Sequence, residues 1–346
     1  MYNKSWYSTT TCKDFTKSGY YKGQLKNINP FYVTGLIDGE GSFTISIYKS
    51  KDRKTGWHVA PSFSIELHGK DLILLNSIQS FFTSSARLLS KATQPLEEYS
   101  GLTTEAVGNI RNRSRNGEAI FSVNSIEELT QIIIPHFDKY PLLTKKREDY
   151  LLFKQAVAII KNKQHLTLEG LTQIISIRSS MNKGLSETLS VNFPDIIPAI
   201  RPCVEPMSII NPNWLAGFTE AEGCFYISIN KAKTTTGYAV QLKFQLTQHS
   251  RDKQLMENIA TYLGCGRYEA RSKNIKAGNL VVSKISDLTE KIIPFYDKYS
   301  IMGCKSQDFS DFKRVSELVL KKAHLTAEGL NLIKKIKSEM NSQRQD

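Results

Sequence analysis

The sequence lacks the features that mark several common protein classes. Its five cysteines, Cys12, Cys203, Cys224, Cys265 and Cys304, are scattered, and none stands in a CxxC pair. This pattern predicts neither a disulfide framework nor a zinc site, and it suits a reducing compartment. No apolar run approaches the ~20 residues that span a bilayer, so we expect no membrane partner. No GxxxxGK[ST] phosphate loop and no Ser/His/Asp or Cys/His catalytic arrangement is evident.

Acidic residues are also in deficit. The chain has 33 Asp and Glu against 46 Lys and Arg, which gives a net charge of +13. Such an excess favours a polyanionic partner such as nucleic acid, although a solvated basic surface would have the same composition. Residues 1–28 are polar, without the apolar core of a secretory signal or the arginines of a mitochondrial transit peptide. We interpret them as a loosely ordered leader.

One pattern occurs twice along the chain. The stretch NPFYVTGLIDGEGSFTISI at 29–47 matches NPNWLAGFTEAEGCFYISI at 211–229. Later segments match as well, including KQHLTLEGL with KAHLTAEGL. We therefore predict a first repeat at 29–183, a Pro-rich linker at 184–210 and a second repeat at 211–346. The first copy is longer, and we place a loop insertion at about 84–118. A duplicated chain generally folds with internal two-fold symmetry, as a monomer that resembles a fused dimer.

Each repeat predicts an α+β unit. Asn29 and Asn211 are N-caps followed by proline, and each begins a short helix that ends at Gly41 or Gly223, where we expect a left-handed turn. Alternating apolar and polar residues then predict half-buried antiparallel strands at 42–48, 62–67, 224–230 and 241–247. Additional strands are expected at 119–123, 266–273 and 279–284. Helices that cover one sheet face are expected at 125–136, 142–163, 167–181, 285–294, 302–322 and 326–340.

Small residues line one face of each short helix. Gly35 and Gly39 are four positions apart in the first copy, and so are Gly217 and Ala221 in the second. Residues at this spacing share a helix face. We therefore predict that the two short helices pack closely against each other along the pseudo-two-fold axis.

Acidic residues stand at the wrong end of these helices. Glu40 and Glu222 fall in the last turn, with Asp38 and Glu220 beside them, where each acid costs roughly 0.3–1 kcal/mol. One isolated carboxylate would most simply be a solvated group, whereas a duplicated pair at a symmetry axis favours a function. Two carboxylates with helix-end carbonyls form an all-oxygen site that suits Mg²⁺. A metal held there can stabilise the attacking and leaving oxygens of a phosphodiester.

The polar strand faces predict a DNA-binding surface. A strand of about ten residues spans ~34 Å, one turn of B-DNA, and a two-stranded ribbon fits the major groove. A solvated sheet face is the alternative, but it would carry more Lys and Glu. We predict DNA contacts from polar strand residues, from the basic loop run at 111–115 and from basic residues near 266–273: Ser42, Thr44, Ser46, Tyr48, Ser50, His58, Ser62, Ser64, Glu66, Arg111, Arg113, Arg115, Cys224, Tyr226, Ser228, Asn230, Gln241, Lys243, Gln245, Thr247, Arg267, Arg271 and Lys273.

The stretches VTGLIDGEG (33–41) and LAGFTEAEG (215–223) resemble the two signature motifs of single-chain LAGLIDADG homing endonucleases encoded in introns of fungal mitochondria. The resemblance extends over about 29–342. It implies two pseudo-symmetric αββαββα repeats that form a saddle of two antiparallel sheets, with helices on the outer face. It also implies hydrolysis of both strands of a DNA target of about two helical turns, with short 3′ overhangs.

The resemblance further implies a metal site. Glu40 and Glu222 match the catalytic and metal-binding acidic positions, and the carbonyls of Gly39 and Ala221 would be further ligands. The expected metal is Mg²⁺; Mn²⁺ or Ca²⁺ could replace it for binding, but Ca²⁺ is not expected to support cleavage. The mitochondrial location follows from this likeness alone.

One departure from the family pattern concerns an auxiliary basic residue near the metal. Ser122 and Val281 occupy the strand positions where we expect it, so Lys243 and Lys284 are the remaining candidates. Two other functions stay open at this point. The chain could be an intron RNA maturase on the same fold, or a regulator that only binds DNA.

Overall fold

The computed structural model describes residues 28–93, 106–113, 117–205, 207, 210–271, 276–341 and 344, without the side chains of 88–93. The predicted leader therefore lies outside the described residues except for Ile28, which is buried. The predicted DNA contacts Arg115 and Lys273 also lie outside them.

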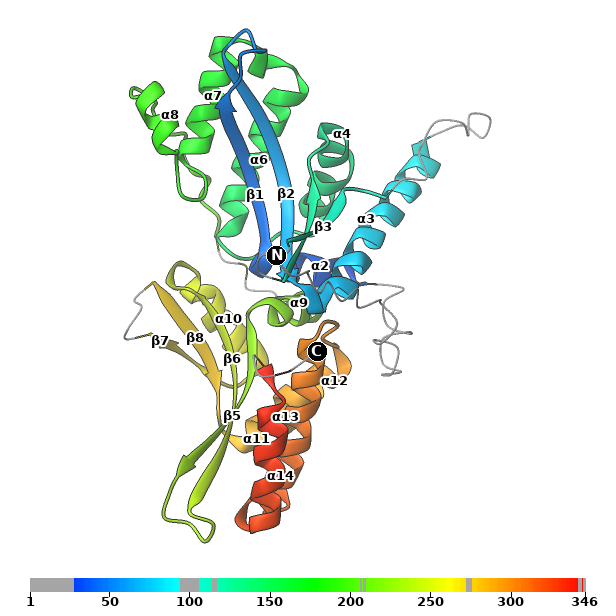
Figure 1. The fold of residues 1–346 in the computed structure, drawn as a ribbon, viewed down its shortest axis with the longest axis vertical. Coiled ribbons are helices and arrows are strands. Elements are labelled where there is room, and N and C mark those ends of the chain that lie inside the picture. The colour runs from blue at the N-terminus through cyan, green and yellow to red at the C-terminus, as the bar shows by residue number, and fades with distance from the viewer. Residues whose placement is uncertain are drawn as a thin grey trace, which may run out of the picture.

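Two similar halves make up the described chain, and Figure 1 shows them above and below a central pair of helices. Each half contains one four-stranded antiparallel sheet, in the order β1-β2-β4-β3 or β5-β6-β8-β7. The strands of the first half are β1 (Gly41–Lys49), β2 (Trp57–His68), β3 (Asn109–Arg113) and β4 (Glu118–Val123). Those of the second are β5 (Gly223–Lys231), β6 (Tyr238–His249), β7 (Arg267–Ala270) and β8 (Ala277–Val282). The predicted α+β class and the predicted saddle of two repeats are confirmed.

The helices follow the same order in both halves. The first half has α2 (Pro30–Glu40), α3 (Leu72–Thr93), α4 (Ile126–Glu128), α5 (Ile134–Lys139), α6 (Lys146–Lys161), α7 (Leu168–Ser179) and α8 (Glu187–Asn192). The second has α9 (Pro212–Glu222), α10 (Lys253–Leu263), α11 (Ile285–Asp287), α12 (Ile293–Lys298), α13 (Lys305–Leu320) and α14 (Ala327–Ser338). A π-helical turn joins α4 to α5 at Leu129–Ile133, and another joins α11 to α12 at Leu288–Ile292. Among the described residues no helix is long and apolar enough to cross a membrane.

The predicted strand alternation places the core between each sheet and its helices. In the first half Phe43 and Phe63 are buried, with ring centroids 5.3 Å apart. Phe225 and Phe244 make the same 5.3 Å contact in the second half. Burying an aromatic side chain contributes about 1.5–3 kcal/mol, so these matched pairs stabilise both halves in the same way.

The central helix pair confirms the prediction from the small residues. A Cβ added at Gly35 would lie 2.0 Å from the carbonyl oxygen of Trp214, and one at Gly217 would lie 2.0 Å from that of Tyr32. The backbones of α2 and α9 are thus in direct contact, which only glycine permits at these two positions. This packing brings the C-terminal ends of the two helices together, next to both sheets.

Some expectations from the sequence are wrong. Residues 84–93 are not loop, because they continue α3, and 109–113 form strand β3. Helices α3 and α10 were not expected between the strands. The linker range 184–210 contains the short helix α8, whereas its described residues 193–205 form no helix or strand. Gly41 and Gly223 are not left-handed, because their φ values are −76° and −82°. Glycine is required there since a Cβ would lie 2.4 Å from the side chain of Ile37 or 2.5 Å from that of Thr219.

Candidate active site at the helix pair

The paired helices end at a cleft between the two halves. Glu40 is exposed at the end of α2, and Glu222 is half-buried at the end of α9. A cleft of about 680 Å³ is lined by Glu40 together with Ala221 and Lys305 of the other half. Glu222 lies against Gly39, because a Cβ added at Gly39 would be 3.2 Å from its Cγ. Each glutamate therefore lies beside the helix end of the opposite repeat.

The neighbouring acids Asp38 and Glu220 have a structural role instead. Both are buried. Asp38 accepts hydrogen bonds from the backbone N–H groups of Leu143 (2.8 Å) and Thr144 (3.1 Å) and from Trp214 Nε1 (2.7 Å). Burial raises the pKa of Asp38, and hydrogen bonds from the Thr144 side chain, the Leu143 N–H and Trp214 oppose that rise.

Glu220 holds the matching segment of the second half. It accepts from the backbone N–H groups of Met302 (3.0 Å) and Gly303 (2.7 Å) and from the Tyr32 hydroxyl (3.0 Å). Buried acids in such networks position the backbone, so only one acid per helix remains for chemistry.

Carboxylates from the opposite repeat hold the same two segments. Asp252 accepts from the backbone N–H of Lys145 at 2.7 Å, and Asp71 accepts from that of Cys304 at 2.7 Å. Because each segment is fixed by both halves, the residue that follows it has a defined position at the start of α6 or α13. That residue is a lysine in both repeats, Lys146 and Lys305.

These two lysines contact the helix ends at the cleft. Lys146 Nζ donates to the carbonyls of Ile37 (2.9 Å) and Gly39 (2.7 Å). Lys305 Nζ donates to those of Thr219 (3.2 Å) and Ala221 (3.1 Å). Cations are favourable at helix C-termini, where the backbone has partial negative charge. The sequence-based search for a basic residue missed both lysines, although they align with each other in the duplicated segment 133–154 and 292–313.

The cleft alters the protonation of its groups. Burial, and next the charge of Glu40, raises the pKa of Glu222 to about 7, while Lys146 and Lys305 oppose the rise. The pKa of Glu40 is also raised, chiefly by desolvation. Burial lowers the pKa of Lys146, and Asp38, Glu222 and Glu40 oppose this change. Carboxylates that ionise reluctantly beside cations are typical of functional sites.

The donor set fits a hard divalent cation. Carboxylates of Glu40 and Glu222 adjoin the carbonyls of Gly39 and Ala221, and all of these are oxygen ligands of the kind that Mg²⁺ prefers. Both carbonyls also accept hydrogen bonds from lysine ammonium groups, which shows that they are available to a cation. No group of three or more His, Cys, Asp or Glu suited to a metal occurs in the described part of the chain. An ion here would therefore complete its coordination with water or a ligand phosphate.

Most of the predicted DNA-contacting residues share the polar faces of the two sheets. Register pairs Ser42 with Ser64, Thr44 with Ser62, and Tyr48 with His58. The second sheet pairs Cys224 with Gln245 and Tyr226 with Lys243. These placements confirm the alternation, while the roles of the residues in binding DNA remain predictions.

Other predicted residues differ from expectation. Arg111 and Arg113 are on strand β3, not in a loop, whereas Arg267 is on β7, within the strand expected at 266–273. Ser228 is 8% exposed and accepts from Asn230, so it is not open to a ligand in this conformation. Among the alternatives for the auxiliary base, Lys243 is on the polar strand face, and Lys284 is the N-cap of α11.

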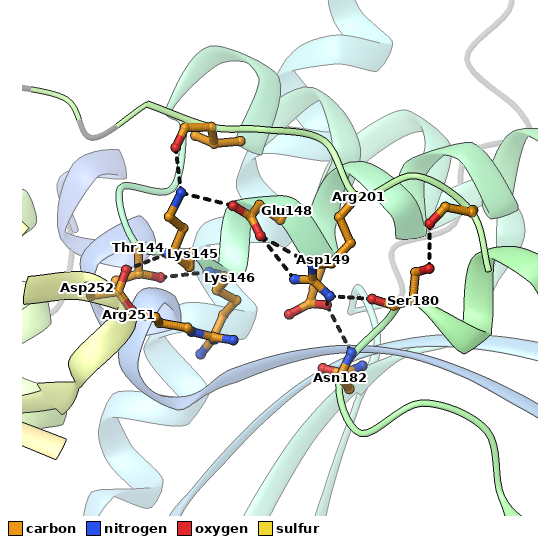
Figure 2. A network of polar contacts seen from close by, with 12 residues as sticks. Thr144, Lys145, Lys146, Glu148, Asp149, Ser180, Asn182, Arg201, Arg251 and Asp252 are labelled. Carbon is orange, nitrogen blue, oxygen red and sulfur yellow. Dashed lines mark hydrogen bonds and ion pairs between the residues drawn. The ribbon is translucent and has the colours of Figure 1, made fainter. Parts of the chain in front are cut away.

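The linker is fastened beside the site. Figure 2 shows Arg201 between Glu148 and Asp149 on α6, with guanidinium contacts of 3.2 and 3.1 Å. In the same network Lys145 Nζ donates to the Val204 carbonyl at 2.8 Å. These contacts tie the linker to the helix that positions Lys146.

Comparison with known proteins assigns the chain to a family. The family model for LAGLIDADG endonucleases matches residues 33–157 and 215–316, one stretch in each repeat. The chain belongs to the LAGLIDADG endonuclease family. Both matched stretches begin within the central helices, so the match includes the cleft and both polar sheets.

Solved structures of this family are similar over nearly the whole chain. The LAGLIDADG homing endonuclease I-SmaMI bound to cleaved DNA has a TM-score of 0.83 and 40% identity, and the match covers 92% of this chain and 99% of that one. I-LtrWI bound to target DNA has a TM-score of 0.82 and 39% identity, covering 91% and 98%. A further I-SmaMI structure is bound to an uncleaved DNA target in the presence of calcium ions.

Curated relatives from Neurospora crassa are longer. Probable intron-encoded endonuclease 3 is 38% identical over 92% of this chain and 56% of its own length. Probable intron-encoded endonuclease 2 is 38% identical over 90% of this chain and 65% of its own length. The chain thus spans between half and two thirds of these relatives.

Proposed function

We propose that this chain is a site-specific DNA endonuclease that hydrolyses both strands of a long, nearly two-fold target with divalent metal. The observation that supports this most directly is the cleft at the paired helix ends. Glu40, Ala221 and Lys305 line this cleft. Glu222, the Gly39 carbonyl and Lys146 lie together at the same pair of helix ends. The family and the DNA-bound solved structures favour the same function.

Each cleavage centre combines residues of both repeats. The first consists of Glu40 with the Ala221 carbonyl and Lys305, which line one cleft. The second consists of Glu222 with the Gly39 carbonyl and Lys146, since Glu222 lies against Gly39 and Lys146 donates to its carbonyl. Two such centres related by the pseudo-two-fold axis suit the two antiparallel strands of a duplex.

The residues of each centre have separate tasks. A bound Mg²⁺ would supply stabilisation of charge on the attacking and leaving oxygens of the phosphodiester. The glutamates provide the negative charge that holds the ion, which requires them to be ionised. The ammonium groups of Lys146 and Lys305 lie where they neutralise charge on a scissile phosphate, as fixed electrostatic stabilisers. Asp38, Glu220, Asp71 and Asp252 keep the lysine segments in place.

The polar sheets bind the DNA in this proposal. Two sheets of this length match a duplex of about two turns, and the side chains of Ser, Thr, Asn, Gln and Lys suit base edges. We further propose short 3′ overhangs, action as a monomer and a mitochondrial location. Names of intron-encoded fungal relatives support the last of these.

Cleavage of a random duplex library tests the proposal. We would incubate the protein with the library in Mg²⁺, with a parallel sample in Ca²⁺, and sequence the DNA ends. The expected result is paired breaks at one long site in Mg²⁺ only. The control is the double variant Glu40→Gln, Glu222→Gln, which keeps size and polarity but removes both charges and is expected to bind without cutting.

Three outcomes would contradict the proposal in different ways. Sequence-specific retention without cut ends would indicate a protein that only binds DNA. No preference for any duplex, together with binding to structured intron RNA, would favour a maturase. Cleavage by the double variant would place the chemistry elsewhere.

A further inference from the structure

Two arginines occupy equivalent positions on the polar faces of the two sheets. Arg113 ends β3 opposite Glu118 on β4. Arg271 follows β7, and its N–H donates to the carbonyl of Ala277 on β8. Glu118 and Ala277 are themselves equivalent, because they face His68 and His249 at the ends of β2 and β6. The duplication therefore places one arginine at the same point of each DNA-facing sheet.

A side chain from β2 or β6, two strands away in the sheet, accepts a hydrogen bond from each arginine. Arg113 Nη1 donates to Glu66 Oε1 at 3.0 Å. Arg271 Nη2 donates to Thr247 Oγ1 at 3.1 Å, and its Nε donates to Asn279 Oδ1 at 3.1 Å. Glu66 and Thr247 are equivalent, each two residues before its strand-terminal histidine. Side chains at equivalent positions therefore orient both guanidinium groups. In the first repeat the acceptor is a carboxylate, and in the second the acceptors are neutral oxygens.

Stability does not account for these contacts. The side chains of Arg113 and Glu66 are 60% and 41% exposed, and exposed ion pairs contribute little to folding. Binding of phosphates does not account for Glu66 either, because a carboxylate on a DNA-facing surface repels the backbone. A carboxylate is useful there when it meets a base edge, since Glu accepts from the cytosine amino group.

The chemistry of the pair suits one base pair. An arginine has five N–H donors, and its fork matches the O6 and N7 acceptors of guanine. The contact with Glu66 uses one donor of Arg113, and the contacts of Arg271 use two, so both retain donors for a base. Glu66 has a second carboxylate oxygen, which can accept from the N4 amino group of the cytosine paired with that guanine.

We propose that Arg113 and Arg271 each read a guanine, at positions of the two half-sites related by the pseudo-two-fold axis, and that Glu66 makes the first position the stricter one. The inference rests on the proposed DNA-binding function. Arg113 and Glu66 together read both bases of a G·C pair. Arg271, held by Thr247 and Asn279, reads only the guanine.

The test is a binding-specificity profile of the full chain in Ca²⁺, measured by selection from a random duplex library. The variants are Arg113→Ala, Arg271→Ala and Glu66→Gln, with Glu317→Gln, which is exposed on α13, as a charge-matched control outside the sheets. Arg113→Ala should lower the preference for guanine at one target position by roughly 5- to 140-fold, the value of one good bidentate contact. Arg271→Ala should do so at the symmetric position only.

The other variants separate the roles of the two repeats. Glu66→Gln should weaken discrimination at the Arg113 position and leave the Arg271 position unchanged, while the control changes neither position. Uniform weakening across all sequences, with a salt slope lower by about one, would identify the arginines as phosphate contacts and overturn the proposal. An unchanged profile in Arg113→Ala would overturn it equally.

The proposed nuclease function is judged separately. Wild-type cleavage in Mg²⁺ decides that question, whereas the profiles are measured by binding. A protein that cuts one site but shows no guanine at the two matched positions contradicts only the present inference.

Discussion

In both repeats a buried acid, Asp38 or Glu220, accepts hydrogen bonds from the same backbone segment, but the side chains around the acid differ. In the first, the short acid Asp38 reaches a long partner, Trp214, and the side chain of Thr144 donates to it at 2.6 Å. In the second, the longer acid Glu220 meets the shorter donor Tyr32. Gly303 replaces Thr144 there, because a Cβ at Gly303 would lie 2.6 Å from Glu220 Oε1.

The difference teaches that the repeats are complementary and not interchangeable. A Cβ at Gly39 would lie 2.2 Å from that of Ala221, so at least one of the two helices must have glycine at this contact. The symmetry is thus one of backbone and of charge at Glu40 and Glu222, while the buried contacts around it specify which helix pairs with which.

The symmetric contact of the helices should be the most sensitive to change. Gly35→Ala and Gly217→Ala each force a Cβ to within 2.0 Å of a facing carbonyl oxygen. We expect each to lower the free energy of unfolding by about 3 kcal/mol, since overpacking costs typically 1–3 kcal/mol and backbone yields least. Denaturant unfolding measures both. A loss in one variant but not the other would mean that the helix pair is not symmetric at these positions.

Exchanging the two residues at the contact between Gly39 and Ala221 should be tolerated better than changing Gly39 alone. Gly39→Ala alone should cost about 1–3 kcal/mol, because its Cβ meets that of Ala221. Adding Ala221→Gly moves the methyl group to the other helix and should restore most of that loss. Ala221→Gly alone is the matched control. Equal stability of the single and double variants would refute the complementarity.

Loss of the larger buried donor, Trp214, should destabilise the protein more than loss of the smaller one, Tyr32. Tyr32→Phe removes one of three donors to Glu220, and we expect a loss of about 1–2 kcal/mol. Trp214→Phe should cost more, because it removes the donor to Asp38 and also leaves a cavity. Thermal unfolding of the two variants ranks them, and the reverse order would contradict the comparison.

The charge of Glu222 should destabilise the free protein. Its pKa of about 7 is above the usual carboxyl value of 4.5, so the folded state disfavours the ionised form. Folding stability therefore falls as the pH rises from about 4.5 to about 7. Glu222→Gln should therefore stabilise the protein at pH 8 by ~1 kcal/mol, after allowance for solvent screening, and have little effect below pH 4.5. Glu339→Gln, on the surface, is the control. A variant less stable than wild type at pH 8 would contradict this assignment.

Much of the fold could be predicted from the sequence because the chain contains two similar repeats. The repeated NP…GEG pattern predicts the helix pair, and alternation predicts the sheet faces around Glu40 and Glu222. Helix α10 was not predicted, although Leu255, Met256 and Ile259 have the spacing of one helix face.

The buried network was beyond sequence reasoning. Asp38 and Thr144 meet only in the fold, more than a hundred residues apart in the chain. Lys146 and Gly39, whose carbonyl accepts from the lysine, are likewise 107 residues apart in the sequence. Local patterns show that an acid or a lysine is duplicated, but tertiary contacts decide which duplicated group is structural and which lies at the cleft.

The most direct test of the central claim is a strand-resolved cleavage assay. On a labelled target, rates of cutting each strand are measured for Glu40→Gln, Glu222→Gln, Lys146→Met and Lys305→Met. Because each centre combines both repeats, Glu40→Gln and Lys305→Met should slow the same strand most, by about 100-fold or more, and Glu222→Gln and Lys146→Met should slow the other. If each lysine instead shares its strand with the glutamate of its own repeat, the composite centres are wrong.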